Sequence, residues 1–456
     1  MNLKTKSNKV FTKKLPAMDL IAAFERLGGN NKAILEFPDY AGGTETIVGF
    51  TPYMEIQAKG SRITVHKDGE KHSFTGNPLE ELKRIAASLP PEFGKHGRAI
   101  GYFGYDFIRN YEEIGEELQD SLSAPDMCFL FHSEYIVRAS DGTAACYLLN
   151  YDGSLTPEAA EARMSELEQM LKEPQQPRKT EDFKFTGFLS EMGQEDYMAG
   201  VLKIKDHILA GDIFQGVLSQ RLKSGYSGRP YEFFKKLRSF NKSQYRFFIE
   251  LEDLQIAGSS PERLVTIREE KALSNPIAGT RPRGKTETED LSLEQELKQD
   301  EKERAEHFML VDLARNDLGK ISRPGTVHVT KLMEIQKYVN VMHLVSDVEG
   351  VLDPGVHFLD AVPAALPAGT VSGAPKIKAM QIINNLETTK RGIYGGGIGT
   401  FTLDGSLDLA LAIRTMIFSG SSAYLQAGAG IVHDSDPEAE WNETLFKAKG
   451  LMEAAK

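Results

Sequence analysis

Residues 426–447, QAGAGIVHDSDPEAEWNETLFK, combine two backbone features that favour a binding site. Gly428 and Gly430 alternate with alanine, so backbone N–H groups in this stretch can come close to a ligand. The run DSDP, residues 434–437, predicts the start of a helix, because a capping residue is followed by proline. The stretch is therefore expected to form a glycine-rich segment that leads directly into a helix.

Two pairs of glutamates share one spacing. Glu440 and Glu443 are three residues apart and lie on one face of the predicted helix, with Lys447 one turn further along that face. Glu303 and Glu306 repeat the spacing within DEKERAEHFMLVDL, which has a strong helical pattern. Two such faces brought together would offer oxygen ligands to Mg²⁺, which favours one or two carboxylates plus water and substrate. The alternative is that each pair is a solvated helix face, because exposed glutamates are common on helices.

The composition is that of a soluble globular protein. The 456 residues are 41% hydrophobic and 26% charged, and the formal net charge of −11 argues against nucleic-acid binding. No apolar run is long enough to span a bilayer, and no signal peptide is evident after the N-terminal lysines. Cys128 and Cys146 give neither a disulfide framework nor metal-ligand spacing, so they are expected to be small core residues. A cytoplasmic protein is therefore expected.

The pattern of elements suggests two parts. Short β-rich runs separated by Gly, Asp and Pro fill residues 33–138, and the polar, proline-rich run EPQQPRKTED at 173–182 is the best linker candidate. We therefore place an N-terminal region at 1–175 and a second domain at 176–456. In the second part, an amphipathic helix is predicted over 197–210, and residues 392–417 resemble a β-hairpin that turns at Asp404-Gly405. The run NPIAGTRPRG, residues 275–284, is not expected to be regular throughout.

Three polar residues stand out against their surroundings. Arg414, in LALAIRTMIF, is predicted to lie within an apolar strand, where a charge is rarely buried without an anionic partner. That partner is either a substrate carboxylate or a structural residue such as Asp408. His343, in VMHLVS, fits either a satisfied core histidine or a functional one. Glu262 follows a proline in a serine-rich turn, where a lone glutamate is usually a surface charge.

Taken together, several motifs resemble the chorismate-utilising enzymes, specifically anthranilate synthase component I. They are NPIAGTRPRG, EKERAEHFMLVDLARNDLG, VMHLVSDVEG, PAGTVSGAPKIKAM, RGIYGGGIGTF and QAGAGIVHDSDPEAEWNET. The resemblance runs from about residue 190 to the C-terminus and is looser before it, where AIGYFGYD carries it. It implies an α+β fold of two antiparallel β-sheets packed together with helices outside. It also implies a lyase that makes anthranilate and pyruvate from chorismate and ammonia, the first step of tryptophan biosynthesis.

The resemblance also implies a Mg²⁺ cofactor and a set of site residues. Glu306 and Glu443 match the positions that ligate the metal, and Glu303 and Glu440 match those that support it through water. Residues that match positions near the ring carboxylate of chorismate are Gly279, Thr280 and Gly430. Those that match positions around the enolpyruvyl carboxylate are Tyr394, Arg414, Gly428 and Lys447. Residues that match the catalytic positions are Glu262, the general acid for the departing hydroxyl, His343, tied to pyruvate loss, and Thr370, which lines the pocket.

One residue of the sequence, Ala278, bears on the source of the nitrogen atom. Relatives that form a covalent lysine adduct carry Lys where this chain has Ala278, so free ammonia is the expected attacker. Neither cysteine lies in a Gly-x-Cys-x-Gly turn, and the ammonia is therefore expected from a separate glutamine amidotransferase subunit, component II, in a hetero-oligomer. Ala278 does not exclude 4-amino-4-deoxychorismate synthase component I of the folate route, although FQGVLSQR looks more like the anthranilate branch. The third alternative is a catalytically silent partner of an amidotransferase.

One departure from the family concerns the tryptophan feedback pocket. That pocket usually begins with Leu-Leu-Glu-Ser, whereas this chain reads ILEF, with Phe37 in place of the serine. Glu36, Asn275 and Pro276 still match pocket positions. The next strand, TETIVGF, lacks the arginine that is usual there. Weak or absent feedback inhibition is therefore expected.

Overall fold

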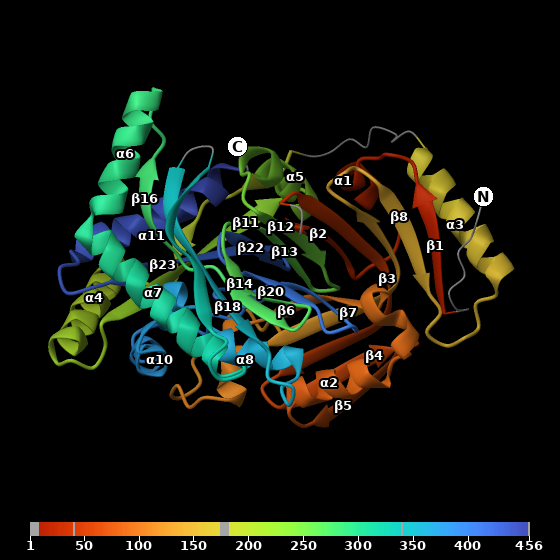
Figure 1. Ribbon diagram of the computed structural model, residues 1–456, viewed down its shortest axis with the longest axis horizontal. Helices are drawn as coiled ribbons and strands as arrows, with labels where there is room; N and C mark the ends of the chain where they lie inside the picture. The colour runs from red at the N-terminus through yellow and green to blue at the C-terminus, as the bar shows by residue number, and fades with distance from the viewer. Residues whose placement is uncertain (1–8, 40–41, 174–181, 339–340, 455–456) are drawn as a thin grey trace.

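The computed structural model describes residues 9–39, 42–173, 182–338 and 341–454. The predicted domain boundary at 175/176 lies outside these residues. Figure 1 shows strands through the centre of the molecule and helices around them. Among the described residues, no helix combines the length and the apolar character that a membrane crossing requires.

The two helices that carry the glutamate pairs are both present, and the one predicted to start at residues 434–437 does so. α7 (Glu301–Gly319) starts at Asp300, whose carboxylate accepts hydrogen bonds from the N–H groups of Lys302 and Glu303. α11 (Pro437–Glu453) starts at Asp436, which accepts from the Ala439 N–H, with proline at the first helical position. Each cap satisfies N–H groups that have no partner within the helix. The predicted helix at 197–210 is also present, as α4 (Gln194–Leu209).

The strand ladders are antiparallel and cross between the two predicted parts of the chain. β2 (Lys32–Pro38) pairs with β12 (Tyr245–Glu250), and β20 (Gly397–Thr402) pairs with β6 (Arg98–Phe103). The other N-terminal strands are β1 (Val10–Leu15), β3 (Thr44–Lys59), β4 (Arg62–Lys67), β5 (Glu70–Thr75), β7 (Met127–Arg138) and β8 (Ala144–Leu149). Further strands of the C-terminal part are β11 (Gln215–Ser227), β13 (Leu254–Ser260), β14 (Arg263–Arg268), β16 (Ile277–Pro282), β18 (Val341–Val351), β21 (Leu407–Leu411), β22 (Thr415–Ser419) and β23 (Ser422–Ile431). The two parts therefore share one hydrogen-bonded framework, and the division at 175/176 stays a prediction.

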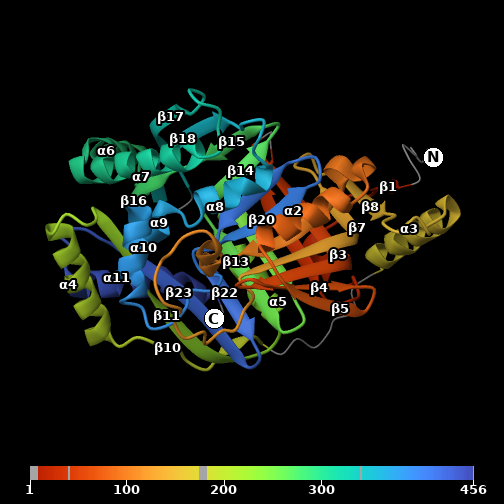
Figure 2. The same ribbon diagram turned by 90° about the horizontal axis from the view of Figure 1, so that it is seen from below.

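Three apolar clusters show that strands face strands and helices lie outside. The central cluster contains residues of β2, β3, β6, β7, β12, β13 and β20 to β23, and no helical residue. The outer cluster on one side brings in α2 (Pro78–Ser88), α7, α8 (Ala361–Ala365), α9 (Gly369–Ser372) and α10 (Lys376–Asn384). The cluster on the other side brings in α1 (Leu20–Phe24), α3 (Pro157–Lys172), α5 (Pro230–Phe240) and α11. Figure 2 shows α2 and α8 on one side of the strands and α5 on the other, which agrees with the predicted α+β fold.

Of three local predictions, the first two are confirmed and the third is wrong. Residues 275–284 are mostly strand, because β16 pairs with β18, but the ladder shifts register at Gly279, whose φ of 65° suits glycine. The predicted hairpin forms from β20 and β21 and turns at Asp404-Gly405. Arg414, however, lies in the bend between β21 and β22, not within a strand, and its own φ is 50°. The prediction of a mid-strand arginine was therefore wrong.

Candidate active site

Glu262 is the most perturbed carboxyl among the predicted site residues. It lies between β13 and β14, its side chain is 9% exposed, and it accepts a hydrogen bond of 2.6 Å from Thr370 Oγ1. Burial raises the pKa of Glu262 to about 7, against the opposing effects of the Thr370 hydrogen bond and the Lys447 charge. A large fraction of this carboxyl is therefore protonated near neutral pH and able to donate a proton. The simple surface-charge interpretation does not hold.

Thr370, Lys447 and Tyr394 bring three further segments to this site. Thr370 lies on the short helix α9, and Lys447 lies on α11 and donates to the Gly428 carbonyl at 3.0 Å. Tyr394 is buried, and burial raises the pKa of its phenol to about 12, so the hydroxyl keeps its proton. That hydroxyl would lie 3.0 Å from a Cβ at residue 428, so glycine allows its approach. Two of the predicted enolpyruvyl-side residues, Tyr394 and Lys447, thus both approach the third, Gly428.

His343 has a defined tautomer. Its Nδ1 lies 2.8 Å from the Gly279 carbonyl oxygen and 3.1 Å from Thr280 Oγ1. A carbonyl only accepts hydrogen bonds, so we assign the proton to Nδ1 and the free lone pair to Nε2. Burial lowers the pKa of His343, and the Arg414 charge lowers it further. The imidazole is therefore neutral near pH 7 and has a nitrogen available as a base.

Arg414 pairs with no anionic side chain in the part of the chain that the structure describes. Its predicted alternative, Asp408, instead accepts from Arg268 at 2.7 Å and from Thr266 at 2.9 Å. Within the described residues the Arg414 side chain makes no hydrogen bond or ion pair. The side chain has exposed area, yet enough protein surrounds the guanidinium that desolvation lowers its pKa, while Tyr394 opposes this shift. The left-handed backbone is uncommon for a non-glycine residue and fits a side chain held for a ligand.

Gln215 connects the α7 glutamate pair to the strand that leads into α11. Gln215, at the start of β11, donates to Glu306 Oε1 at 3.1 Å, and its amide nitrogen would lie 2.8 Å from a Cβ at Gly430. Burial, and then the charge of Glu306, raises the pKa of Glu303. These contacts connect the α7 pair to β11 and β23, which leads into α11.

The α11 pair also combines burial with neighbouring charges. Burial raises the pKa of Glu440, the Glu443 charge adds to the rise, and the charges of Lys447 and of Lys302 on α7 oppose it. Across the described ranges, no group of three or more His, Cys, Asp or Glu side chains is arranged to hold a metal ion. The metal assignment of Glu303, Glu306, Glu440 and Glu443 therefore stays a prediction.

The ring-carboxylate residues lie at the bulge of β16 and at the end of β23. A Cβ at Gly279 would lie 3.3 Å from Glu303 Oε2, so this glycine allows the α7 pair to approach β16. Thr280 is exposed beside His343, and Gly430 is half-buried against Gln215. The absence of a side chain at Gly430 thus lets the Gln215 side chain come close to the backbone of β23. Gln215 and its contact with Glu306 were missed by sequence reasoning, because nothing in FQGVLSQR indicates which distant residue the glutamine meets.

The two polar residues of the predicted feedback pocket, Glu36 and Asn275, already have partners within the chain. Glu36 is 1% exposed and accepts from Arg238 Nε at 2.6 Å and Nη2 at 2.8 Å, and Arg246 Nε lies 3.1 Å away. Asn275 accepts from Arg263 and donates to Asp347. Pro276 is buried next to it.

Phe37 fills part of the same region. Its ring packs edge-to-face on Tyr245 with centroids 4.9 Å apart, and the Tyr245 hydroxyl accepts from Arg263 Nε at 2.8 Å. Phe37 is therefore connected to Asn275 through Tyr245 and Arg263.

Comparisons with known proteins identify the family of the chain. The sequence profile of the chorismate binding enzymes matches residues 31–453. Anthranilate synthase component 1 of Lactococcus lactis is 40% identical over 448 residues, which cover 95% of this chain and 97% of that protein. The protein of the same name from Neisseria meningitidis is 40% identical over 91% of this chain and 87% of its own length.

Solved structures give the same result. The crystal structure of anthranilate synthase component I from Streptococcus pneumoniae superposes with a TM-score of 0.81 at 39% identity, over 96% of this chain and 98% of that chain. The menaquinone-specific isochorismate synthase of Escherichia coli, at 20% identity and a TM-score of 0.78, shares the fold over 98% of this chain and 94% of its own. The chain therefore belongs to the chorismate-binding enzymes, within the anthranilate synthase component I family.

Proposed function

We propose that this chain is the synthase subunit that converts chorismate and ammonia into anthranilate, pyruvate and water, the first step of tryptophan biosynthesis. The observation that carries the proposal is the Glu262 carboxyl, buried, bonded to Thr370 and half-protonated near neutral pH. General acids work best with a pKa near the working pH, and an ordinary surface glutamate lacks that property.

Glu262 acts in the first half of the reaction. Thr370 donates to Oε1 and so leaves Oε2 to carry the proton toward the substrate. As ammonia adds to the ring, that proton passes to the ring hydroxyl, which leaves as water. Glu262 then regains a proton from the added nitrogen or from solvent. A neutral acid is needed here because a carboxylate cannot donate.

His343 acts in the second half. Its Nδ1–H is held by the Gly279 carbonyl, so Nε2 is the nitrogen that accepts the ring proton. Loss of that proton expels the enolpyruvyl group as pyruvate and makes the ring aromatic. The lowered pKa of His343 keeps the imidazole in its neutral, accepting form.

The two substrate carboxylates are held by different groups. Arg414, whose guanidinium makes no ion pair within the described residues, binds the enolpyruvyl carboxylate with the Tyr394 hydroxyl and Lys447, beside Gly428. The ring carboxylate lies beside Gly279, Thr280 and Gly430. Both ends of the substrate are thus fixed relative to Glu262 and His343.

The donor set fits Mg²⁺, which typically takes one or two protein carboxylates and fills its other positions with water and substrate. Glu306 and Glu443 would hold the ion, and Glu303 and Glu440 would support it through water. The like charge that raises the pKa of Glu303 would be relieved by such a cation. When bound, the ion neutralises a substrate carboxylate.

The ammonia comes from a glutamine amidotransferase subunit. The word "component" in the names of the relatives supports a two-part enzyme. Burial raises the pKa of both cysteines of this chain, so neither Cys128 nor Cys146 is a reactive thiolate for glutamine hydrolysis. Ala278, in β16, offers no amine for a covalent adduct.

The direct test is product identification. The purified chain is incubated with chorismate, MgCl₂ and ammonium at alkaline pH, and fluorescent anthranilate is expected. Accumulation of non-aromatic aminodeoxychorismate would reassign the chain to the folate route. Absence of any chorismate consumption would overturn the proposed activity.

A further inference from the structure

Arg391 is a buried cation directly behind the proposed site and is not one of the predicted catalytic, substrate-binding or metal-binding residues. It is 2% exposed, and its guanidinium forms a bidentate pair with Glu387, with Nε to Oε2 at 2.8 Å and Nη2 to Oε1 at 2.7 Å. Glu387 in turn accepts from both the N–H and the hydroxyl of Ser219. The pair is therefore neutralised internally and leaves further donors of the guanidinium free for other contacts.

Those donors contact the segments that carry the site residues. Nη1 donates to the Val371 carbonyl at 2.5 Å, one residue after Thr370, and Nη2 donates to the Val217 carbonyl at 2.8 Å. Val217 pairs with Gly430 in the β11–β23 ladder. The guanidinium also lies over the rings of Tyr105, at 4.6 Å, and Tyr394, at 5.6 Å. One side chain thus connects the Thr370 turn, the glycine-rich strand and Tyr394.

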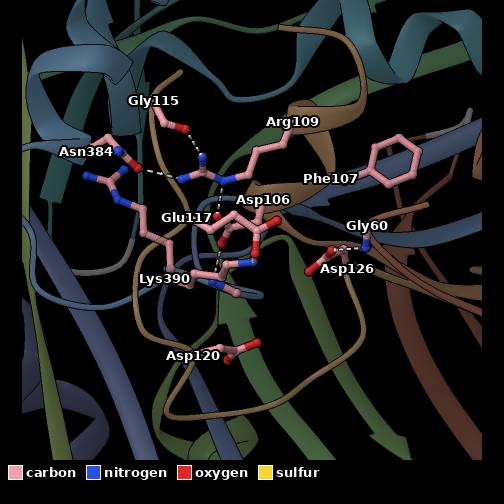
Figure 3. A network of polar contacts seen from close by, with 12 residues as sticks. Gly60, Asp106, Phe107, Arg109, Gly115, Glu117, Asp120, Asp126, Asn384 and Lys390 are labelled. Atoms are coloured by element: carbon pink, nitrogen blue, oxygen red, sulfur yellow. Dashed lines mark hydrogen bonds and ion pairs between the residues drawn. The ribbon is translucent and has the colours of Figure 1, made fainter. Parts of the chain in front are cut away.

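The chain on both sides of Arg391 is fixed by the loop that follows β6, as Figure 3 shows for part of the network. Lys390 forms an ion pair with Glu117 at 2.8 Å. On the other side, Asp106 accepts from the Gly392 N–H at 2.9 Å and from Arg109 Nε at 3.0 Å. A guanidinium anchored in this way has one available position. Its geometry is therefore imposed on the segments that it contacts, since planar, bidentate contacts fix orientation as well as distance.

We propose that Arg391 is a positioning residue of the chorismate site: it holds the Thr370 turn and the Tyr394 ring in register with Glu262 and itself touches no substrate. This role rests on the proposed function. A purely structural role would predict that variants that still fold keep their turnover and pH dependence. A positioning role predicts that the folded variants lose turnover, because Thr370 no longer meets Glu262 at hydrogen-bond distance.

The first test is Arg391→Lys, measured in the full chain with ammonium as nitrogen donor. Lysine keeps the charge but cannot reproduce the planar fork to Glu387 and the two carbonyls. We expect kcat/KM for chorismate to fall at least tenfold. The pH midpoint assigned to Glu262 should also move upward, because the Thr370 hydrogen bond holds that pKa down. The matched control is Arg163→Lys in α3, which removes a bidentate guanidinium contact with the buried Glu134, at 2.8 Å and 3.0 Å, away from the three segments. It should change kcat/KM less than threefold.

A double-mutant cycle identifies the route of the effect. Thr370→Val is made alone and together with Arg391→Lys, and the loss caused by Thr370→Val should be much smaller when Arg391→Lys is already present. If circular dichroism and a melting curve show that Arg391→Lys does not fold, Glu387→Met/Arg391→Met replaces it, because apolar replacement of a buried pair often preserves stability. That folded double variant should show the same loss of turnover.

Three results would overturn the inference: a folded position-391 variant with unchanged kcat/KM and pH midpoint, additive losses in the cycle, or an equal loss in Arg163→Lys. An inactive wild-type chain is a different failure. It would overturn the proposed function, whatever the variants do.

Discussion

Glu36 and Glu262 are two buried carboxyls in one strand framework, and they differ in the side chains that contact them. Glu36, in β2, is flanked by the guanidinium groups of Arg238 and Arg246. Glu262 accepts one hydrogen bond from a neutral hydroxyl, and the cation that influences it, Lys447, is bonded to Gly428 and Glu443. Burial without a direct counter-ion raises the pKa of Glu262 to about 7.

The difference separates a structural carboxylate from a reactive one. A carboxylate with two guanidinium partners has its hydrogen bonds satisfied before any ligand arrives. It joins β2 to α5 and β12, and few of its lone pairs are available to a ligand. A carboxyl that stays neutral for lack of a counter-ion can give up its proton when the substrate brings charge into the site. Burial alone therefore does not predict function.

The largest expected effect is on turnover when the reactive carboxyl is replaced. Glu262→Gln keeps the size of the side chain and the acceptor for Thr370 but removes the transferable proton. We expect kcat to fall by about 10²–10⁴, the usual contribution of a positioned general acid. The measurement is anthranilate fluorescence under saturating chorismate. A loss below about threefold would show that Glu262 is another structural carboxyl.

The same substitution should stabilise the protein at alkaline pH. The folded-state pKa of about 7 lies above the ordinary glutamate value, so the folded chain binds the proton more tightly and loses stability as pH rises from about 4.5 through 7. A shift of this size corresponds to at most about 3 kcal/mol, fully expressed above pH 8. Glu262→Gln should remove this loss, and melting curves of the two proteins should diverge between pH 5 and pH 8. Parallel curves would contradict the raised pKa.

Local features of the sequence predicted more of this molecule than long-range ones. The run at 434–437 correctly predicts the start of α11, because capping depends on neighbours a few residues away. The motifs also indicate the fold. The partner of Glu36 is Arg238, 202 residues further along, and the contact of Gln215 with Glu306 spans 91 residues. Such pairings depend on how the strands are ordered, which no local pattern encodes, and this is also why Arg414 was misplaced into a strand.

Neutralising Glu36 should affect stability rather than chemistry. In Glu36→Gln, Arg238 and Arg246 lose their common anion, and removing one partner of a buried pair typically costs about 3–5 kcal/mol. Because the Arg238 side chain is 31% exposed and can be solvated, we expect a lower value of about 2 kcal/mol. Urea denaturation measures this cost. Turnover of the folded variant, assayed at low temperature, should stay within threefold of wild type, and a larger loss would break the distinction between the two carboxyls.

The smallest expected effect is that of added tryptophan. Its ammonium group would need Glu36, which the two arginines already occupy, and the Phe37 ring packs on Tyr245 where family members carry a serine. An unsatisfied buried polar group costs about 1–3 kcal/mol, or up to roughly a hundredfold in affinity. We therefore expect weak or no inhibition in a tryptophan titration of anthranilate formation. Phe37→Ser should restore it only partly, and strong inhibition of the unmodified chain at low micromolar tryptophan would contradict this.

The β2–β12 and β6–β20 ladders have a consequence for dividing the gene. If the chain is split between residues 173 and 182, each fragment alone presents unpaired strand edges, which favour aggregation. Produced in the same cell, the two fragments would complete each other's sheets and reassemble without a covalent link. Anthranilate fluorescence from the two fragments would then report that the sheets had been completed across the cut.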